Sequence, residues 1–188
     1  MTKRRSKVPK PFILVILGDS TAGKTTLLSN LKKISALNRK IKIRDIDDLN
    51  PPIPGRENWR KYRVDELLYQ AIEDNKAGKS AIIGGWLWPF EIITSPYFSH
   101  KLNLRFLFLN NTKTEYRRRL RLRLGTRAMG MPLKNSHILS LVAGFEERKK
   151  RLENQIFSLS KADTVATDKL NSLEVLDYTL KIISNYYS

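Results

Sequence analysis

The stretch Gly-Asp-Ser-Thr-Ala-Gly-Lys-Thr at residues 18–25 constrains the fold more than any other part of the sequence. It fits the pattern Gly-x-x-x-x-Gly-Lys-Ser/Thr. An apolar run at 12–17 comes before it, with the length and composition of a buried parallel strand. A helical pattern follows, with four apolar residues on one face: Leu27, Leu28, Leu31 and Ile34. A strand, a glycine-rich turn and a helix in this order predict a phosphate-binding loop in an α/β fold.

The chemistry expected of this loop follows from its backbone. Its N–H groups wrap phosphate oxygens, and the N-terminus of the next helix adds the positive end of its dipole. Lys24 would reach the β- and γ-phosphates of a nucleotide, and the Thr25 hydroxyl would ligate Mg²⁺. We therefore predict a nucleotide site made of Gly18, Asp19, Ser20, Thr21, Ala22, Gly23, Lys24, Thr25 and Thr26.

Composition narrows the class of protein. A chain of 188 residues with 41% hydrophobic and 28% charged residues is typical of one soluble domain with a sizeable core. The absence of cysteine excludes disulfides and thiolate metal sites, and two histidines are too few for a histidine metal cluster. No apolar stretch approaches the length of a membrane span, so we expect a cytoplasmic protein without a membrane partner.

The net charge of +17 is unusual, and the basic residues are spread along the chain. Such a charge is typical of nucleic-acid binding, but an enzyme that handles anionic phosphates also needs arginines. Nucleic acid therefore stays open as a partner and is not the preferred one. Residues 1–11 carry five basic residues and two prolines, and we interpret them as a flexible basic arm.

Acidic residues follow the second predicted strand, at 41–45. This strand alternates apolar and basic residues, which indicates a position near the edge of the sheet. Asp45 and Asp47 come at its carboxyl end, where open α/β sheets bind ligands, and their spacing of two puts both on one side of an extended segment. One carboxylate could hold Mg²⁺ and one could take the proton of an acceptor hydroxyl. A solvated turn or a helix cap is the alternative.

Two further groups of residues are candidates for binding an acceptor of the phosphoryl group. Arg60 and Arg63 lie three apart on a predicted helix, and they either clamp an anionic acceptor or form a solvated basic face. The third predicted strand ends in Gly84 and Gly85, which permit close approach of a ligand. No acidic residue follows this strand to supply the usual carboxylate near the metal. We therefore expect an aspartate at the end of the second strand to supply it. The aromatic segment 86–90 is either a wall of the acceptor pocket or core, and core is the preferred interpretation.

A run of arginines belongs to the helix after the fourth strand, which Thr112 and Glu115 open with a capping box. A spacing of four sorts the arginines into two rows: Arg117 with Arg121, and Arg119 with Arg123 and Arg127. Like charges in a row repel each other, which is tolerable if one row faces phosphates. For some of these arginines a solvated helix face is the alternative. Residues 125–137 then form a connection that could close over the nucleotide.

The remaining elements complete an alternating pattern. Helices are predicted over 57–77 and 138–158, after Pro89 and from a cap at Ser172, and strands over 81–85, 104–109 and 162–167. Five short strands that alternate with helices predict a parallel sheet covered on both faces.

The order of these signals resembles the small P-loop kinases of the shikimate kinase, gluconate kinase and nucleoside monophosphate kinase (adenylate kinase-like) group. The resemblance covers residues 12–186. It implies the P-loop NTPase fold, an α/β fold with a five-stranded parallel sheet of order 2-3-1-4-5, helices on both faces and an Arg-rich lid at about 117–137. It also implies ATP with Mg²⁺ as the donor, and a kinase domain over 12–188.

The resemblance and the residue patterns together suggest roles for single residues. The catalytic set is Lys24, Asp45, Asp47, Arg121, Arg123 and Arg127. The resemblance implies an acceptor set of Asp47, Gly84 and Gly85, to which helical spacing adds Arg60 and Arg63; the acceptor arginine of shikimate kinase has no secure match here. Arg117, Thr167 and Asp168 would bind the nucleotide, and Thr25 with Asp45 would hold the metal. The pattern departs from shikimate kinase at Trp86, where that family has a third glycine, and residues 49–51 only echo gluconate kinase. The acceptor therefore stays unassigned.

These signals favour an ATP-dependent kinase that transfers the γ-phosphoryl group to a hydroxyl or phosphate of a small molecule. A kinase of nucleic-acid 5′-ends, or another nucleic-acid-associated P-loop NTPase, is the first alternative because of the charge. A non-catalytic nucleotide-binding module is the second. Either a monomer or a homodimer is compatible with the sequence.

Overall fold

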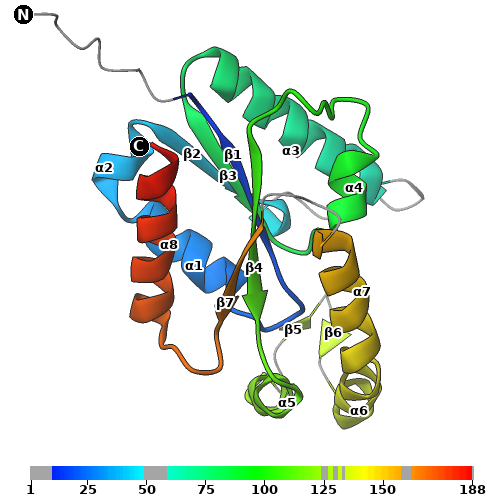
Figure 1. Cartoon of the computed structure of the whole chain (residues 1–188). Coiled ribbons are helices and arrows are strands. Elements are labelled where there is room, and N and C mark those ends of the chain that lie inside the picture. Colours follow the sequence, from blue (N-terminus) through cyan, green and yellow to red (C-terminus); the bar gives the residue numbers. More distant parts are fainter. Residues whose placement is uncertain are drawn as a thin grey trace, which may run out of the picture.

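The framework of the protein is a five-stranded, all-parallel sheet in the order β2-β3-β1-β4-β7 (Figure 1). It is seen in a computed structural model that describes residues 10–48, 59–123, 127–128, 131–132, 134–157 and 162–187. The strands are Ile13–Leu17 (β1), Ile41–Asp45 (β2), Ser80–Gly84 (β3), Leu104–Asn110 (β4) and Ala162–Ala166 (β7). Counted along the chain, these five strands have the order 2-3-1-4-5, so the predicted fold class is confirmed.

Strand β1 is the centre of the sheet and is covered on both faces. All five of its side chains are fully buried. Ile13, Val15 and Leu17 belong to one hydrophobic cluster, whereas Leu14 and Ile16 belong to the other. Successive side chains of a strand point to opposite faces, so one apolar run supplies both cores.

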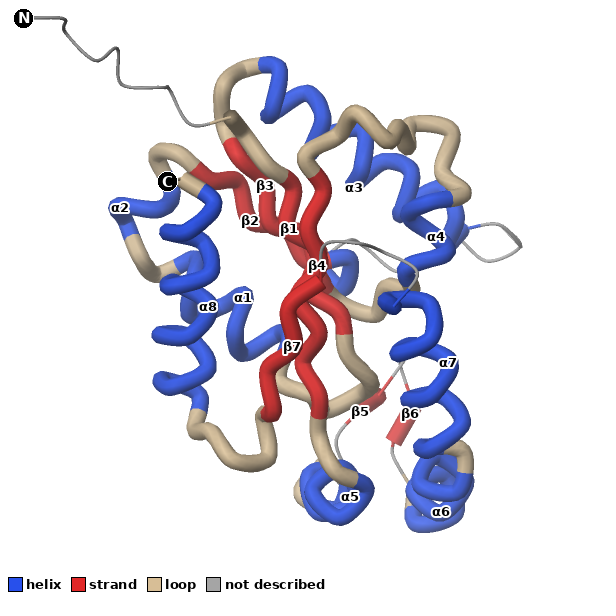
Figure 2. The backbone as a smooth tube through the Cα atoms, viewed as in Figure 1, coloured by secondary structure: helices blue, strands red, loops and turns tan. Residues whose placement is uncertain are grey.

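Helices form a layer on each face of the sheet (Figure 2). One layer contains α1 (Lys24–Lys32), α2 (Ser35–Asn38) and α8 (Ser172–Tyr186). The other contains α3 (Trp59–Lys76), α4 (Pro89–Ile93) and α7 (Phe145–Phe157). None of the helices in the described ranges combines the length and the apolar character needed to cross a membrane.

A third, smaller cluster lies beyond the carboxyl end of β4. It joins α5 (Lys113–Arg121) to α6 (Asn135–Ala143) and α7 through Tyr116, Leu120, Ile138 and Phe145. Two short antiparallel strands, β5 (Arg127–Ala128) and β6 (Met131–Pro132), lie between α5 and α6 in the sequence. The described part of the predicted lid thus begins with a packed helix.

The single helix predicted over 138–158 is wrong, because the chain forms α6 and α7 with a break at Gly144. A Cβ atom at residue 144 would lie 2.7 Å from Nη1 of Arg148, so that guanidinium occupies the space of a side chain. Phe145 packs its ring 4.7 Å from that of Tyr116, which anchors the start of α7. Long-range packing therefore overrides the continuous helical pattern.

The extended segment predicted to carry both aspartates is also shorter than expected. Strand β2 ends at Asp45, and residues Ile46–Asp48 form a 3₁₀ turn, η1. The alternation of a strand does not apply in that turn, so the argument that placed Asp45 and Asp47 on one side is wrong. The side chain of Asp47 lies outside the described residues.

Helix α8 is capped by Asn171 and not, as predicted, by Ser172. The Asn171 Oδ1 atom accepts hydrogen bonds from the backbone N–H groups of Leu173 (2.9 Å) and Glu174 (3.1 Å). Glu174 in turn accepts one from the backbone N–H of Asn171 (2.7 Å). The reciprocal pair is a capping box that begins one residue earlier than the sequence suggested.

We expect Asn171→Ala to lower the free energy of unfolding by about 1 kcal/mol, because it removes the acceptor of two helix N–H groups. For a domain of this size the thermal midpoint should fall by about 2–4 °C. The matched control is Ser172→Ala, which should change the midpoint by less than about 1 °C because a side chain at the first helical position makes no such cap. Equal losses in both variants would contradict the assignment of the cap.

Candidate functional site

The phosphate-loop motif lies where the sequence predicts it, between β1 and α1. Its predicted nucleotide-binding residues fall into the loop, Gly18, Asp19, Ser20, Thr21, Ala22 and Gly23, and the first turn of α1, Lys24, Thr25 and Thr26. Gly23 precedes the helix with a φ of 97°, a left-handed conformation that L side chains rarely adopt. Among the described residues, and apart from its chain neighbours, no atom lies within 4 Å of the place where a Cβ would stand, so the space beside Gly23 is open.

Polar groups of the loop fit a phosphate ligand. The first turn of α1 has no side-chain cap, which leaves its N–H groups for an anion. The Thr21 hydroxyl is buried and has no hydrogen-bond partner among the described residues. The Lys24 ammonium donates to the carbonyls of Gly18 and Asp19, at 2.8 Å each, and so lies folded over the loop. Such donors match the phosphate oxygens of a nucleotide.

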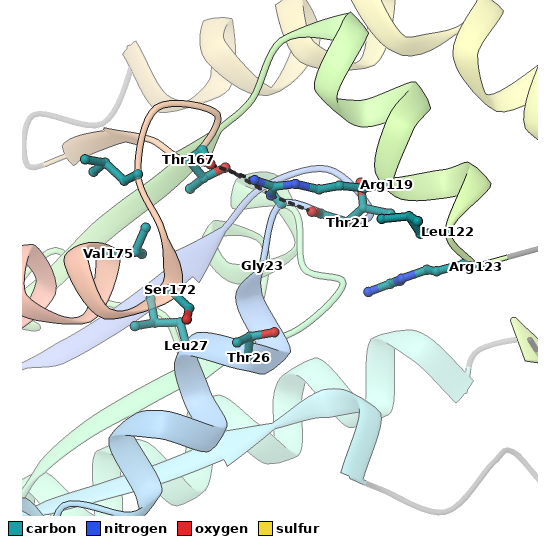
Figure 3. Close-up of a pocket in the computed structure, with 12 residues that line it drawn as sticks. Thr21, Gly23, Thr26, Leu27, Arg119, Leu122, Arg123, Thr167, Ser172 and Val175 are labelled. Atoms are coloured by element: carbon teal, nitrogen blue, oxygen red, sulfur yellow. Dashed lines mark hydrogen bonds between the residues drawn. The ribbon is translucent and has the colours of Figure 1, made fainter.

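A cavity of about 310 Å³ opens beside the loop (Figure 3). Its walls come from the phosphate loop and α1, the end of α5, the segment after β7 and the start of α8. Thr167 lines it, as the sequence predicts for a nucleotide-side residue, and is only 3% exposed. Asp168 is not among the lining residues. A cavity of this size that joins a phosphate loop suits the nucleoside part of a nucleotide.

Arg119 crosses one side of this cavity and was not among the predicted site residues. Its Nη1 atom donates to the Thr21 carbonyl (3.0 Å), and Nη2 donates to the Thr167 carbonyl (2.6 Å). Its Nε atom donates to Glu115 at 2.6 Å. Hydrogen bonds from Arg118 and then from Arg119 lower the pKa of Glu115 to about 2, against the opposing effect of burial. The carboxylate therefore stays ionised at neutral pH and keeps the guanidinium in place.

The two rows of arginines on α5 have different surroundings. Arg119 and Arg123 line the cavity, whereas Arg117 and Arg121 are exposed and are not among its lining residues. The structure therefore does not bring the predicted Arg117 and Arg121 to the nucleotide cavity. The side chain of Arg127 lies outside the described residues.

The sequence carried no signal that singled out Arg119. Tyr116 and Leu120 are buried and define the inward face of α5. Measured from the centre of that face at 100° per residue, Arg119 and Arg117 both lie about 80° away, on opposite sides. Helical spacing therefore does not separate these two arginines, and the tertiary contacts of α5 decide which of them meets the cavity.

Arg148 of α7 is a second residue that the sequence analysis did not single out. Its Nε atom donates to Asp19 of the phosphate loop (3.1 Å), and Nη2 donates to the Tyr116 hydroxyl (3.1 Å) and the Leu141 carbonyl (2.6 Å). Burial, and then the charge of Asp19, raise the pKa of Tyr116 to about 12, so the phenol stays neutral. This network ties the loop to α6 and α7. Within the run of four basic residues at 148–151, nothing local distinguishes Arg148.

The predicted acceptor side lies at the carboxyl ends of β2 and β3. Asp45 is 3% exposed and pairs in register with Gly84. Gly85 has a φ of 106°, and a Cβ there would collide with Oδ1 of Asp45 and with Ile46. Asp45, Gly84 and Gly85 are thus brought together, and the absence of a side chain at 85 leaves room for the buried Asp45 carboxylate against the backbone of the glycine.

The two arginines predicted to clamp the acceptor are already bound to carboxylates. Arg60 pairs with Glu91, donates to the Trp86 carbonyl and lies 4.5 Å from the centre of the Trp86 ring. Arg63 pairs with Glu66 at 2.7 Å. Their predicted contact with an acceptor remains a prediction.

The aromatic segment divides between core and surface. Leu87 is buried, and Trp88 packs against the core beside it. Trp86 and Phe90, however, are 44% and 39% exposed. The preferred interpretation as core is therefore wrong for Trp86 and Phe90. The exposed indole of Trp86 directly follows Gly85.

Candidate oxygen ligands for Mg²⁺ lie in both halves of the candidate site. Thr25 is exposed on the first turn of α1, and Asp45 ends β2. Within the described ranges, no three His, Cys, Asp or Glu side chains gather as a metal-binding group. A hydroxyl and one carboxylate fit Mg²⁺ that is held mainly by nucleotide phosphates and water. The donor chemistry thus suits a nucleotide-bound metal and not a metal held by protein alone.

Comparison with known proteins rests on structure. No protein-family model and no curated protein matches the sequence. A sugar kinase from Janibacter sp. HTCC2649 is similar in structure, with 13% identity, 93% of this chain and 95% of that chain covered, and a TM-score of 0.52. A gluconokinase from Sinorhizobium meliloti 1021 has 13% identity, 95% coverage of both chains and a TM-score of 0.55. The protein APE1195 has 10% identity, 96% and 99% coverage and a TM-score of 0.54.

Sequence identities of 10–13% support a shared fold and nothing more specific. They agree with the sheet order, with the loop after β1 and with the helices on both faces. The chain therefore has the fold of the small P-loop kinases of the gluconate and shikimate kinase group.

Proposed function

We propose that the chain is an ATP-dependent kinase that transfers the γ-phosphoryl group to a hydroxyl or phosphate of a small molecule. The observation that carries the proposal is the placement of Lys24 and the buried Asp45 at the same edge of one parallel sheet. Lys24 follows β1 and Asp45 ends β2, and the carboxyl ends of both strands belong to the edge at which open α/β sheets bind ligands. The activities of the neighbouring sugar kinase and gluconokinase support a phosphotransferase in general.

The donor half of the proposed site would bind MgATP. The loop N–H groups and Lys24 would hold the phosphates, and the base would enter the cavity between Arg119 and Val175. Thr25 and Asp45 would supply oxygen ligands to Mg²⁺, which neutralises phosphate charge when it is bound.

The acceptor half would work through Asp45. Its carboxylate takes the proton of the acceptor hydroxyl as the hydroxyl oxygen bonds to the γ-phosphorus. The bond from that phosphorus to the bridging oxygen breaks, and ADP leaves. Gly85 gives the acceptor room beside the carboxylate, and Trp86 offers an exposed apolar wall. For a phosphate acceptor, Asp45 would only orient the group.

The remaining parts of the proposed site close over it. We assign residues 12–188 to one kinase domain and about 117–137 to its lid. Arg121, Arg123 and Arg127 would offset the charge of the migrating phosphoryl group once the lid is closed. Of these three, Arg123 already lines the nucleotide cavity.

The experiment that tests the proposed function is a screen for acceptor-dependent conversion of ATP to ADP. Sugar acids, nucleoside monophosphates and oligonucleotide 5′-hydroxyls are offered in parallel, with Lys24→Ala as the matched inactive protein. We expect one small-molecule class to raise turnover, and Lys24→Ala to lower kcat by about 100-fold or more. ATP binding without turnover on any acceptor would favour the non-catalytic module, and activity only on oligonucleotides would favour the nucleic-acid-end kinase.

Asp45→Asn should lower kcat by about 100-fold or more with a hydroxyl acceptor, because the amide cannot accept the proton. The matched control is Asp48→Asn, three residues later, where the carboxylate is exposed and pairs with Lys32. That control should keep activity within about twofold. Asp47→Asn is measured beside them, and full activity in both the Asp45 and the Asp47 variants would contradict a carboxylate base in this segment.

Arg119→Ala should weaken ATP binding about tenfold, a loss of about 1.4 kcal/mol. The physical reason is that its guanidinium forms a wall of the cavity and bridges Thr21 to Thr167. Arg118→Ala is the matched control, since Arg118 pairs with Glu115 but its side chain is 60% exposed. Affinities are measured by calorimetry, with thermal midpoints to verify folding. A similar loss in both variants would mean that Arg119 acts only through the stability of α5.

A further inference from the structure

Four lysines precede four neighbouring strands of the sheet. Lys40 and Lys79 come directly before β2 and β3, whereas Lys10 and Lys101 come three residues before β1 and β4. Lys10, Lys40 and Lys101 are exposed and Lys79 is partly exposed. Because the amino ends of parallel strands meet at one edge of a sheet, these cations gather there. We call these four lysines the amino-edge row.

Backbone hydrogen bonds hold the starts of these strands side by side. The Ser80 N–H donates to the Lys40 carbonyl (2.9 Å), and the Ile13 N–H donates to the Asn103 carbonyl (2.9 Å). The Asn75 side chain donates to the carbonyls of both Lys79 (2.9 Å) and Phe12 (3.2 Å). With strands about 4.8 Å apart, the row β2-β3-β1-β4 spans about 14 Å.

None of the four lysines of the amino-edge row belongs to an ion pair among the described residues. The carboxylates at the end of α3 pair with other cations, Glu73 with Lys76 and Asp74 with Arg44. One carboxylate near this edge, Asp163 of β7, accepts a hydrogen bond from the neutral Tyr186 hydroxyl at 2.6 Å, and β7 lies outside the four-strand row. The four cations therefore exceed the negative charge near them and attract an external polyanion.

We propose that the amino-edge row binds the phosphate backbone of a nucleic acid. A span of about 14 Å equals about four intervals of 3.4 Å between successive phosphates along one strand of a duplex, so each lysine can reach a phosphate. Four more basic residues, Lys3, Arg4, Arg5 and Lys7, precede Lys10 in the sequence and lie outside the described residues. Phosphate contacts of this kind fix position and carry no sequence information, so the binding is sequence-independent.

An anionic membrane surface fits this edge less well than a nucleic acid. Stable attachment to a membrane needs apolar side chains that enter the lipid. Three aromatic residues near the start of β1 are instead packed on each other, with Phe12 fully buried and its ring 5.2 Å from Tyr186 and 5.3 Å from Tyr187. Their engagement with each other favours a soluble polyanion over a lipid surface.

The proposed surface is independent of the proposed kinase activity. Strand β1 begins at the amino-edge row and ends at the phosphate loop, so its length separates the two by about 16 Å. In Figure 1 the arrow of β4 points away from this edge and toward α5. Nucleic acid at the amino edge would therefore leave the nucleotide cavity open and would hold the enzyme on a strand.

The test is the salt dependence of oligonucleotide binding. Fluorescein-labelled single-stranded RNA and DNA of about 20 nucleotides are titrated with the full chain at several KCl concentrations. In the edge variant Lys10, Lys40, Lys79 and Lys101 are changed to Gln; in the matched control, with the same charge, Lys61, Lys113, Lys150 and Lys169 are changed to Gln. We expect the edge variant to lose about 3 in the slope of log K against log salt, at about 0.7 for each phosphate contact, and at least about tenfold in affinity at 100 mM KCl.

The control variant should keep most of the slope, and both variants should keep the thermal midpoint and the ATP affinity of the unchanged protein. If the edge variant does not fold, Lys40→Gln with Lys101→Gln carries the same test with half the change, against Lys113→Gln with Lys150→Gln. Absence of oligonucleotide binding, equal losses in edge and control variants, or lysine-dependent binding to phosphatidylserine vesicles but not to oligonucleotides would overturn the proposal.

Discussion

The shape of the nucleotide cavity depends on the hydrogen bonds of Arg119. This one side chain joins the carbonyl of Thr21 in the phosphate loop to that of Thr167 after β7, while Glu115 holds it from α5. Backbone carbonyls at two ends of the cavity are thus fixed by a planar donor whose geometry allows little freedom. The rotation of α5 sets the direction of this donor, and burial of Tyr116 and Leu120 sets that rotation. The small hydrophobic cluster that contains Tyr116 and Leu120 therefore determines where Arg119 stands beside the cavity.

The fold could be predicted because its signals are local. Strand β1 is a run of apolar residues that only a fully buried position accepts, and the glycine at 23 meets a backbone conformation that other residues rarely adopt. The site residues on α5 were harder to predict from the sequence. Helical spacing shows which arginines share a row, but the row that faces inward depends on how the helix packs. That is why Arg119 was missed while Arg117, on the same helix, was assigned.

The other differences come from contacts between distant segments. Gly144 interrupts a continuous helical pattern because Arg148 turns back over it toward Asp19 and Tyr116. In the same way, the 3₁₀ turn after Asp45 invalidates an argument that holds only for extended chain. Tertiary contacts of this kind leave no periodic signal in the sequence, so only the structure reveals them.

A parallel sheet sorts charge by position along its strands. At the carboxyl edge, cations meet carboxylates or carbonyls of the site, as Arg148 meets Asp19 and Arg119 meets Glu115. At the amino edge, four of the five strands add a lysine, and none of these lysines belongs to an ion pair among the described residues. The length of the strands separates the two edges, so the charge of one edge can change without altering the geometry of the other. The large positive charge of the chain is therefore compatible with a small-molecule site, since part of that charge stands at the opposite end of the sheet.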